Sequence, residues 1–406
     1  MLNKLKKLGP GLLVTAAFIG PGTVTTASVA GASFGFTLMW VIIFSIFATI
    51  VLQEMTSRLG LISRAGLGEA IRIIFQNPIL TIFATLLVVA AIAFGNAAFE
   101  TGNIIGAAIG LEGLTDISPK IWALLVGAAA IALLATGTYR VIERVLIAMV
   151  IIMSVVFILT AIIVRPNISN VLAGVFVPRI PTGGLITTIA LIGTTVVPYN
   201  LFLHSSSVQE KWSRSLPPRQ ALAESRFDTV LSIAIGGLIT MTIVATAAAA
   251  FFEQGIEIKN AATMANQLKP LLGSAANYFF ALGLLSAGLT SAITAPLAAA
   301  YATSGVLGWK RNMRDWKFRA VWAIIILIGT ILAIIGKSPI AAIVFAQAAN
   351  GILLPLIAVF LLIVMNRSDL LAEFKNGIAA NIFGILVVVI TAGLGIFQLL
   401  KVFGII

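Results

Sequence analysis

Two short stretches decide the fold of this chain, Gly20-Pro21-Gly22-Thr23 and Val197-Pro198-Tyr199-Asn200. Each lies in the middle of a long apolar segment. Proline removes one backbone hydrogen bond of a helix, and its ring clashes with the carbonyl one turn earlier. The two glycines beside Pro21 lower the cost of unwinding further. Each stretch therefore predicts either a kink or a complete break of a helix inside an apolar segment.

The composition of the chain places those segments in a membrane. Of its 406 residues, 60% are hydrophobic and only 10% are charged, and the mean hydropathy is +1.10. Apolar runs of about 20 residues recur along the chain, and a helix of that length crosses a hydrocarbon core about 30 Å thick. The runs are continuous rather than alternating, which indicates helices that satisfy their own backbone hydrogen bonds. We therefore expect an all-α integral membrane protein.

The apolar runs predict eleven transmembrane helices, near residues 11–32, 37–57, 78–109, 120–137, 142–164, 183–208, 228–252, 270–305, 319–335, 339–365 and 377–403. The two proline-containing stretches fall in the first and the sixth of them. Matching interruptions in corresponding spans of two repeats point to the binding site of a transporter, so we favour complete breaks over kinks. We expect one transporter domain over residues 1–406, with repeats at about 11–164 and 183–365 and an extra helix at about 377–403.

The basic residues orient the chain in the membrane. There are 26 Lys and Arg residues, and the net charge is +12. In the expected topology 19 of them lie in one set of loops, and the other seven are Lys120, Arg165, Arg179, Lys259, Lys269, Lys337 and Lys401. Cytoplasmic loops carry the excess of basic residues. We therefore expect a plasma (cell inner) membrane protein with a cytoplasmic N-terminus and an extracytoplasmic C-terminus. The charge reports orientation in the lipid bilayer and indicates no nucleic-acid partner.

Several kinds of chemistry have no motif in this sequence. The chain contains no cysteine, which excludes disulfides and thiolate metal ligands. It contains no Walker-type nucleotide loop and no HExxH zinc motif. We therefore expect a secondary transporter that is not an enzyme and uses no cofactor.

The broken helices also predict where the substrate binds. A helix that ends inside the membrane leaves carbonyl and N–H groups without intrahelical partners, and lipid tolerates these only beside a cavity or a ligand. Span ten adds two amides that are three residues apart and share a helix face, although hydrogen bonding between helices explains them equally well. The predicted substrate-binding residues are Gly20, Gly22, Thr23, Val197, Tyr199, Asn200, Gln347 and Asn350.

Two ionisable side chains are candidates for coupling transport to a proton or another cation. Glu100 is the one acidic residue that we place inside a span, and a carboxyl group in a membrane is costly enough to suggest a function. The alternative is a carboxyl that is merely hydrogen-bonded to Asn96 or Asn103. His204 is the only histidine and lies six residues beyond Pro198, about 9 Å along a helix. Histidine titrates near neutral pH and can pass protons; the alternative is a polar residue at a helix end.

Several runs of residues resemble the Nramp family of proton-coupled divalent-metal transporters. The first helix of that family is similar to Gly9-Pro10-Gly11-Leu12-Leu13-Val14 followed by Gly20-Pro21-Gly22-Thr23. Its sixth-helix signature is similar to Pro198-Tyr199-Asn200-Leu201-Phe202-Leu203-His204-Ser205-Ser206. The resemblance covers essentially the whole chain. It implies a LeuT-like inverted repeat of five plus five helices with one extra helix, in which helices 1 and 6 are discontinuous. It also matches His204 to the family's proton-linked histidine.

The chain departs from the family at the positions that bind metal. The family's first-helix motif is Asp-Pro-Gly-Asn, and the metal-binding Asp and Asn are replaced here by Gly20 and Thr23. The family's sixth-helix motif is Met-Pro-His-Asn, and its Met and His are replaced by Val197 and Tyr199. The two acids of the family's third helix correspond to Glu100 and Asn103.

These replacements decide which cargo we expect. A divalent cation dehydrated beside neutral groups leaves two charges uncompensated, which costs several kcal/mol or more. The helix ends that begin at Pro21 and Pro198 present N–H groups, which suit a carboxylate. We therefore predict proton- or ion-coupled uptake of a small polar or anionic organic solute and assign no metal site. The alternatives are a divalent-metal transporter of the Mg²⁺ or Mn²⁺ type that uses backbone carbonyls and Glu100, and a receptor or scaffold on the same fold.

Overall fold

The structure is a computed structural model that describes residues 9–75, 77–115, 117–136, 140–212, 216–309 and 312–405. Within these ranges every regular element is a helix. Six of the basic residues that served to orient the chain lie outside the described ranges: Lys4, Lys6, Lys7, Arg214, Lys310 and Arg311.

The helices follow the order of the expected spans. The first part of the chain contains α2 (Pro10–Phe18), α3 (Pro21–Phe34), α4 (Met39–Ser63), α5 (Leu67–Ile74), α6 (Pro78–Glu112), α7 (Pro119–Thr136), α8 (Arg140–Val164) and α9 (Ile168–Phe176). The second part contains α10 (Leu185–Thr195), α11 (Pro198–Lys211), α12 (Pro218–Ala247), the π-helix Ala248–Phe252, α13 (Ala261–Ala265), α14 (Lys269–Leu272), α15 (Ala276–Leu307), α16 (Trp316–Ile335), α17 (Pro339–Met365), α18 (Ser368–Leu371) and α19 (Ile378–Val402).

The number of membrane-crossing helices agrees with the expected topology. Ten of the described helical segments are long and apolar enough to cross a membrane. The first expected span, which is divided into the short helices α2 and α3, is not among them. The sixth span is divided into α10 and α11. The predicted all-α fold with discontinuous first and sixth helices is therefore confirmed.

Some boundaries differ from those expected. The seventh span starts at Pro218 rather than near 228, because Pro218 occupies the first turn of α12, where its missing N–H needs no partner. The largely polar residues 218–227 therefore belong to α12. The helices α5 and α9 were not expected. The first of them begins with a capping interaction in which the Gly66 N–H donates to Glu69 Oε2 at 2.9 Å.

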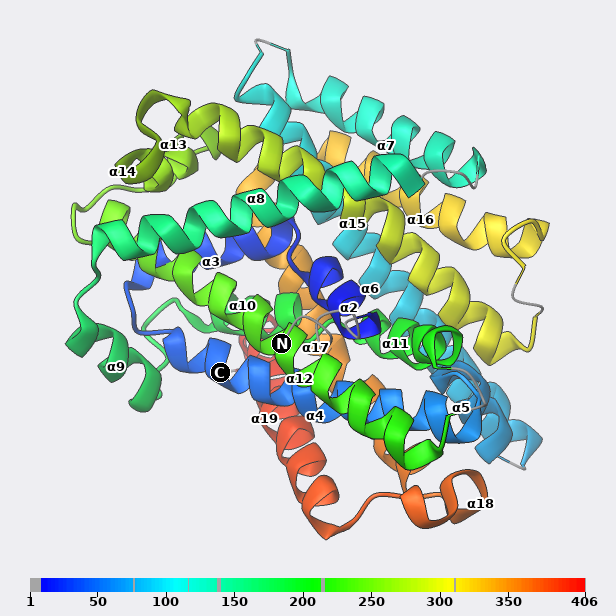
Figure 1. Cartoon of the computed structure of the whole chain (residues 1–406). Coiled ribbons are helices and arrows are strands. Elements are labelled where there is room, and N and C mark those ends of the chain that lie inside the picture. Colours follow the sequence, from blue (N-terminus) through cyan, green and yellow to red (C-terminus); the bar gives the residue numbers. More distant parts are fainter. Residues whose placement is uncertain are drawn as a thin grey trace.

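The broken sixth span lies in the core of the bundle. In the segment Leu185–Lys211, 94% of the most apolar stretch is buried, against 22% in α19. Figure 1 shows α19 at one edge of the bundle and α7 at the opposite edge. The helix α6 packs against α15, α16 and α17, and α17 in turn packs against α10. The two broken spans also pack against α4 and α12, and the side chains of α6, α15 and α17 described below reach the breaks.

Candidate functional site at the broken helices

The two helix breaks have the same backbone conformation. In the first, Ile19 has φ −79° and ψ 67°, Gly20 is extended, and Pro21 opens α3. In the second, Val196 has φ −97° and ψ 73°, Val197 is extended, and Pro198 opens α11. Each break therefore consists of one turning residue, one extended residue and a proline. The breaks are complete rather than kinks, and they leave the last carbonyls of α2 and α10 without the N–H groups of a following turn.

A pair of hydroxyl groups joins the two breaks. Thr23 Oγ1 donates to the carbonyl of Phe18, across the first break. It also lies 2.7 Å from Thr194 Oγ1 on α10. The two hydroxyls therefore form a hydrogen bond between the first and sixth spans. The predicted residue Thr23 is therefore placed at the contact between the two broken spans, and it is fully buried.

The space beside Gly20 is occupied by polar atoms of other helices. A Cβ atom at Gly20 would lie 2.8 Å from Ser291 Oγ of α15 and 3.8 Å from Asn103 Oδ1 of α6. The backbone of Gly20 has φ −106° and ψ −176°, a conformation that any residue can adopt. The Ser291 hydroxyl, rather than the backbone, therefore excludes a side chain there. Both oxygens are buried and have no hydrogen-bond partner in the described part of the chain.

Gln347 of α17 reaches the first break from the opposite side. Its amide group occupies the position that a Cβ of Gly22 would take, and its Nε2 lies 3.4 Å from the corresponding position on Gly102 of α6. Its backbone carbonyl oxygen likewise occupies the position that a Cβ atom of Gly193 in α10 would take. The Gln347 side chain is fully buried, and neither of its polar atoms has a partner among the described residues. The Gln347 amide therefore lies against Gly22 in the first break.

Glu100 is linked to the first break through the side chain of Asn103. Its Oε2 accepts a hydrogen bond of 3.3 Å from Asn103 Nδ2, and the Oδ1 of the same amide faces Gly20. Gly329 of α16 packs directly against the Glu100 side chain. Glu100 is fully buried, and Oε1 has no partner in the described ranges. The hydrogen bond to Asn103 that was considered as an alternative is therefore present, and it leaves one carboxyl oxygen free.

Two of the predicted residues follow Pro198 in the second break. The Tyr199 ring packs edge-on against Phe99, with 5.4 Å between the ring centroids. Its hydroxyl is buried and has no partner within the described residues. Asn200 is fully buried, and both of its amide atoms are likewise unpartnered there. The second break thus contributes further polar atoms that the protein itself leaves unsatisfied.

Asn350 and His204 lie away from the first break. Asn350, one turn beyond Gln347, faces α6, where its Oδ1 lies 3.2 Å from the position of a Cβ on Gly95. His204 Nδ1 lies 2.8 Å from Gln53 Oε1 of α4. The other ring nitrogen, Nε2, is buried and makes no hydrogen bond to a described residue. The structure therefore joins His204 to α4 and shows no hydrogen bond from it to either break.

Four residues of this arrangement were not among the predicted site residues: Asn103, Thr194, Gln53 and Ser291. Ser291 belongs to a polar stripe in α15, but a stripe of Ser and Thr side chains usually reflects bonding to the preceding helical turn. Gln53 is a glutamine in an apolar span. Its sequence signal is that such an amide needs a hydrogen-bond partner on another helix, and His204, the only histidine of the chain, was a candidate for that partner. None of the four could have been assigned without knowing which helices touch.

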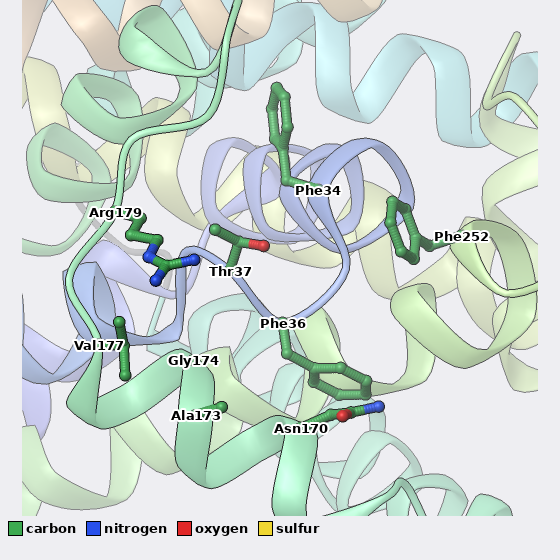
Figure 2. Close-up of a pocket in the computed structure, with 9 residues that line it drawn as sticks. All are labelled: Phe34, Phe36, Thr37, Asn170, Ala173, Gly174, Val177, Arg179 and Phe252. Atoms are coloured by element: carbon green, nitrogen blue, oxygen red, sulfur yellow. The ribbon is translucent and has the colours of Figure 1, made fainter.

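The donor set is rich in oxygen and poor in charge. Within the described residues, no group of three or more His, Asp and Glu side chains lies close enough to hold a metal ion. A separate cavity of about 390 Å³ lies where α3 ends and α4 begins, beside α9. Figure 2 shows Thr37, Arg179 and three phenylalanines around it. None of the predicted site residues lines that cavity, so the breaks remain the candidate site.

Comparison with known proteins identifies the family. A profile of the family described as Natural resistance-associated macrophage protein-like matches residues 11–401. The chain belongs to the Nramp family. The divalent metal cation transporter MntH of Yersinia pestis (strain Pestoides F) is 30% identical over 405 residues, which is 98% of this chain and 95% of the relative. The protein of the same name from Pectobacterium carotovorum subsp. carotovorum (strain PC1) is 28% identical over 401 residues, or 98% and 94% of the two chains.

Solved structures support the same fold. A manganese transporter of Eremococcus coleocola has a TM-score of 0.77 and 21% identity, and the match covers 97% of this chain and 86% of that one. MhsT in complex with L-phenylalanine has a TM-score of 0.61 and 17% identity, and the match covers 96% and 97% of the two chains. These likenesses show the LeuT-like fold. As an Nramp member with ten long apolar helices, the chain is a multi-pass membrane transport protein.

The prediction of a small organic solute as cargo is wrong. The relatives that match nearly the whole chain are named divalent metal cation transporters, and they favour the alternative instead. The physical reason lies in the first break. The metal-binding side chains of the family motif are absent, but Ser291 Oγ and Asn103 Oδ1 lie beside Gly20, and the Gln347 amide lies beside Gly22. The loss of the motif residues therefore does not deprive the break of donors for a cation.

Proposed function

We propose that this Nramp member transports a divalent metal cation of the hard type, Mg²⁺ or Mn²⁺, through the site at the two breaks. The observation that carries the proposal is the set of buried polar atoms without a described partner at the first break: Ser291 Oγ and Asn103 Oδ1 beside Gly20, and the Gln347 amide beside Gly22. Burying a polar group without a partner costs free energy, so a set of such groups at one place indicates a ligand. A cation would satisfy all of these oxygens at once.

The chemistry of the donors argues for a hard ion. The available atoms are amide, hydroxyl and carboxyl oxygens together with the backbone carbonyls at the ends of α2 and α10. Mg²⁺ and related hard ions prefer such oxygen ligands, and Mg²⁺ keeps several of its waters. The sulfur ligand of the family motif is replaced by Val197, which removes the donor that favours softer ions. Glu100, which is linked to the first break through Asn103, supplies a negative charge that partly compensates the charge of the cation.

Coupling and orientation complete the proposal. We assign the coupling role to Glu100 and His204, because both are fully buried ionisable side chains and a proton is the coupling ion that both can carry. The distribution of basic residues supports a cytoplasmic N-terminus and an extracytoplasmic C-terminus. The location that fits an Nramp transporter is the plasma membrane, and the two repeats form one transporter domain.

Uptake into proteoliposomes tests the proposed cargo. The purified full chain is reconstituted, and uptake of Mg²⁺, Mn²⁺ and Cd²⁺ is measured together with the internal pH. We expect saturable uptake of Mg²⁺ or Mn²⁺ that exceeds uptake of Cd²⁺, with proton entry. The variant Gln347→Leu should abolish uptake, and Gln398→Leu on the peripheral helix α19 is the matched control.

The outcomes separate the parts of the proposal. Absence of saturable uptake of any divalent cation by folded wild-type protein would refute the cargo. A preference for Cd²⁺ over Mg²⁺ and Mn²⁺ would refute the hard-ion assignment. Metal uptake without a change of internal pH would contradict proton coupling and leave the cargo intact.

A further inference from the structure

A second polar cavity lies far from the breaks along the chain, among α4, α12 and the segment that joins α18 to α19. Its volume is about 590 Å³, and it is lined by four basic and two acidic side chains together with small and apolar residues. The charged residues are Arg58, Arg219, Arg226, Lys375, Glu54 and Glu373. Both α18 and α19 pack against α4 (Figure 1). The transport site makes no use of this cavity.

The acidic side chains of the cavity do not neutralise its basic ones. Glu54 is shared by two arginines, because Oε2 accepts from Arg58 at 3.0 Å and Oε1 pairs with Arg226 at 2.8 Å. The second carboxylate, Glu373, pairs with Arg219 at 3.4 Å. In that pair the side chains are 81% and 64% exposed, so the pair contributes little stability. Lys375 makes no ion pair with any residue that the structure describes. The cavity therefore keeps an excess of positive charge.

A buried arginine makes this cavity a built site rather than a cluster of surface charges. Arg58 is 5% exposed. Its guanidinium donates to the Phe374 carbonyl at 2.8 Å and to Asn376 Oδ1 at 2.8 Å, which anchors the segment before α19 to α4. The remaining nitrogen, Nε, is buried and has no hydrogen-bond partner in the described part of the chain. An unpartnered donor at the wall of a positively charged cavity indicates that the ligand is an anion.

The start of α19 adds further donors to the same cavity. Gly377, the residue before this 25-residue helix, lines the cavity and offers no side-chain cap to the first N–H groups. Unsatisfied N–H groups and the positive end of the helix dipole favour an anion such as a phosphate group. The next residues on this helix are apolar and open to the surroundings, since Ile378 is 82% and Ile382 is 58% exposed. The cavity therefore lies where a lipid-facing helix emerges from the hydrocarbon.

We propose that this cavity binds the phosphate headgroup of an anionic phospholipid, with the acyl chains along α19. Basic pockets between transmembrane helices on the cytoplasmic side suit such headgroups, and the loops that form this cavity belong to the expected cytoplasmic set. In this arrangement Lys375, Arg219, Arg226 and the first N–H groups of α19 contact the phosphate. The site is independent of the metal cargo and lies outside the transport machinery.

The test compares lipid nanodiscs of two compositions. The full chain is placed in phosphatidylcholine alone or with phosphatidylglycerol, and thermal unfolding and lipid retention in native mass spectrometry are measured. The wild type should unfold at a higher temperature with phosphatidylglycerol, because a ligand that binds only the folded state stabilises it. The double variant Lys375→Gln, Arg219→Gln removes two exposed charges and should fold normally. Each basic residue contributes about fivefold to binding, so the variant should hold the anionic lipid roughly 25-fold less tightly.

The matched control is Arg314→Gln, which removes an exposed basic residue outside the cavity. It should keep the full response to phosphatidylglycerol. Equal unfolding temperatures of the wild type in both lipids, or an equal loss of response in the control, would overturn the proposal. Full protection by inorganic phosphate in phosphatidylcholine nanodiscs would also overturn it, because the ligand would then be a soluble phosphate and not a lipid.

Discussion

Replacement of Glu100 by Gln removes the negative charge that is linked to the first break through Asn103, and it leaves the size of the side chain nearly unchanged. The magnitude follows from the chain of contacts that runs from Glu100 through Asn103 to Gly20, with steps of 3.3 Å and 3.8 Å. Because the two amide atoms of Asn103 are themselves about 2 Å apart, a cation beside Gly20 is at most about 9 Å from the carboxylate, and at an effective dielectric constant of about 20 the attraction of a divalent cation is at least about 4 kcal/mol. Desolvation of the buried carboxylate offsets about half of this. The net loss should be about 2 kcal/mol, or about 30-fold in affinity.

The assay is Mn²⁺ and Mg²⁺ uptake into proteoliposomes over a range of concentrations. Glu100→Gln should raise KM by the stated factor and reduce the proton movement that accompanies uptake. The matched control is Glu112→Gln, because Glu112 lies on the same helix, α6, at its exposed end. It should leave both quantities unchanged. A KM for Glu100→Gln equal to that of the wild type would show that the carboxyl does not act on the cation, and the electrostatic reasoning would be refuted.

Three further substitutions test particular contacts. Gly22→Ala should displace the Gln347 amide, whose atoms occupy the position of the new Cβ, and should lower metal uptake in protein that remains folded. Asp228→Asn should loosen the start of α2, because the buried Asp228 carboxylate accepts hydrogen bonds from two N–H groups there, at 2.8 Å and 2.9 Å. The substitution should cost about 1 kcal/mol. This cost should appear as faster hydrogen exchange in α2. Gln53→Leu should leave His204 without its partner at 2.8 Å, which lowers stability by about 1–3 kcal/mol in thermal unfolding.

Each of these substitutions has a control and an outcome that contradicts it. Gly393→Ala adds a methyl group where nothing lies within 4 Å and should not affect uptake; unchanged uptake in Gly22→Ala would contradict the close contact. Hydrogen exchange in α19 should be the same in Asp228→Asn and wild type, and equal exchange in α2 would contradict the anchoring role. Gln220→Leu on α12 controls for Gln53→Leu, and equal unfolding temperatures of Gln53→Leu and wild type would contradict the buried bond.

The membrane topology and the helix breaks could be predicted from the sequence. Apolar length and proline placement act within a few consecutive residues, so they do not depend on the rest of the fold. The spans 339–365 and 377–403 agree with α17 and α19 to within a residue. The two breaks occur at the predicted prolines. The ten-residue error at the start of α12 arose because its polar first turns extend beyond the apolar run, and hydropathy reports the membrane rather than the helix.

The positions of the helix breaks could be predicted from the sequence, but the side chains that surround them could not. The motif positions Gly20 and Val197 lack ligand side chains, and from these alone a site without metal donors was inferred. Ser291 is separated from Gly20 by 271 residues, and its contact with Gly20 depends on how α15 packs against the first span. Serine and threonine side chains are common in membrane helices, so their pattern does not reveal which of them faces a break.

The sequence by itself determined that this chain crosses the membrane repeatedly and that its first and sixth spans end at Pro21 and Pro198, because hydropathy and the missing proline N–H are local properties. Only the tertiary structure decided which atoms meet at those ends. It places the amide of Gln347 against Gly22, and it joins three separate segments around a positively charged cavity. Both outcomes depend on the close approach of helices far apart in the chain, which is set by packing over the whole bundle.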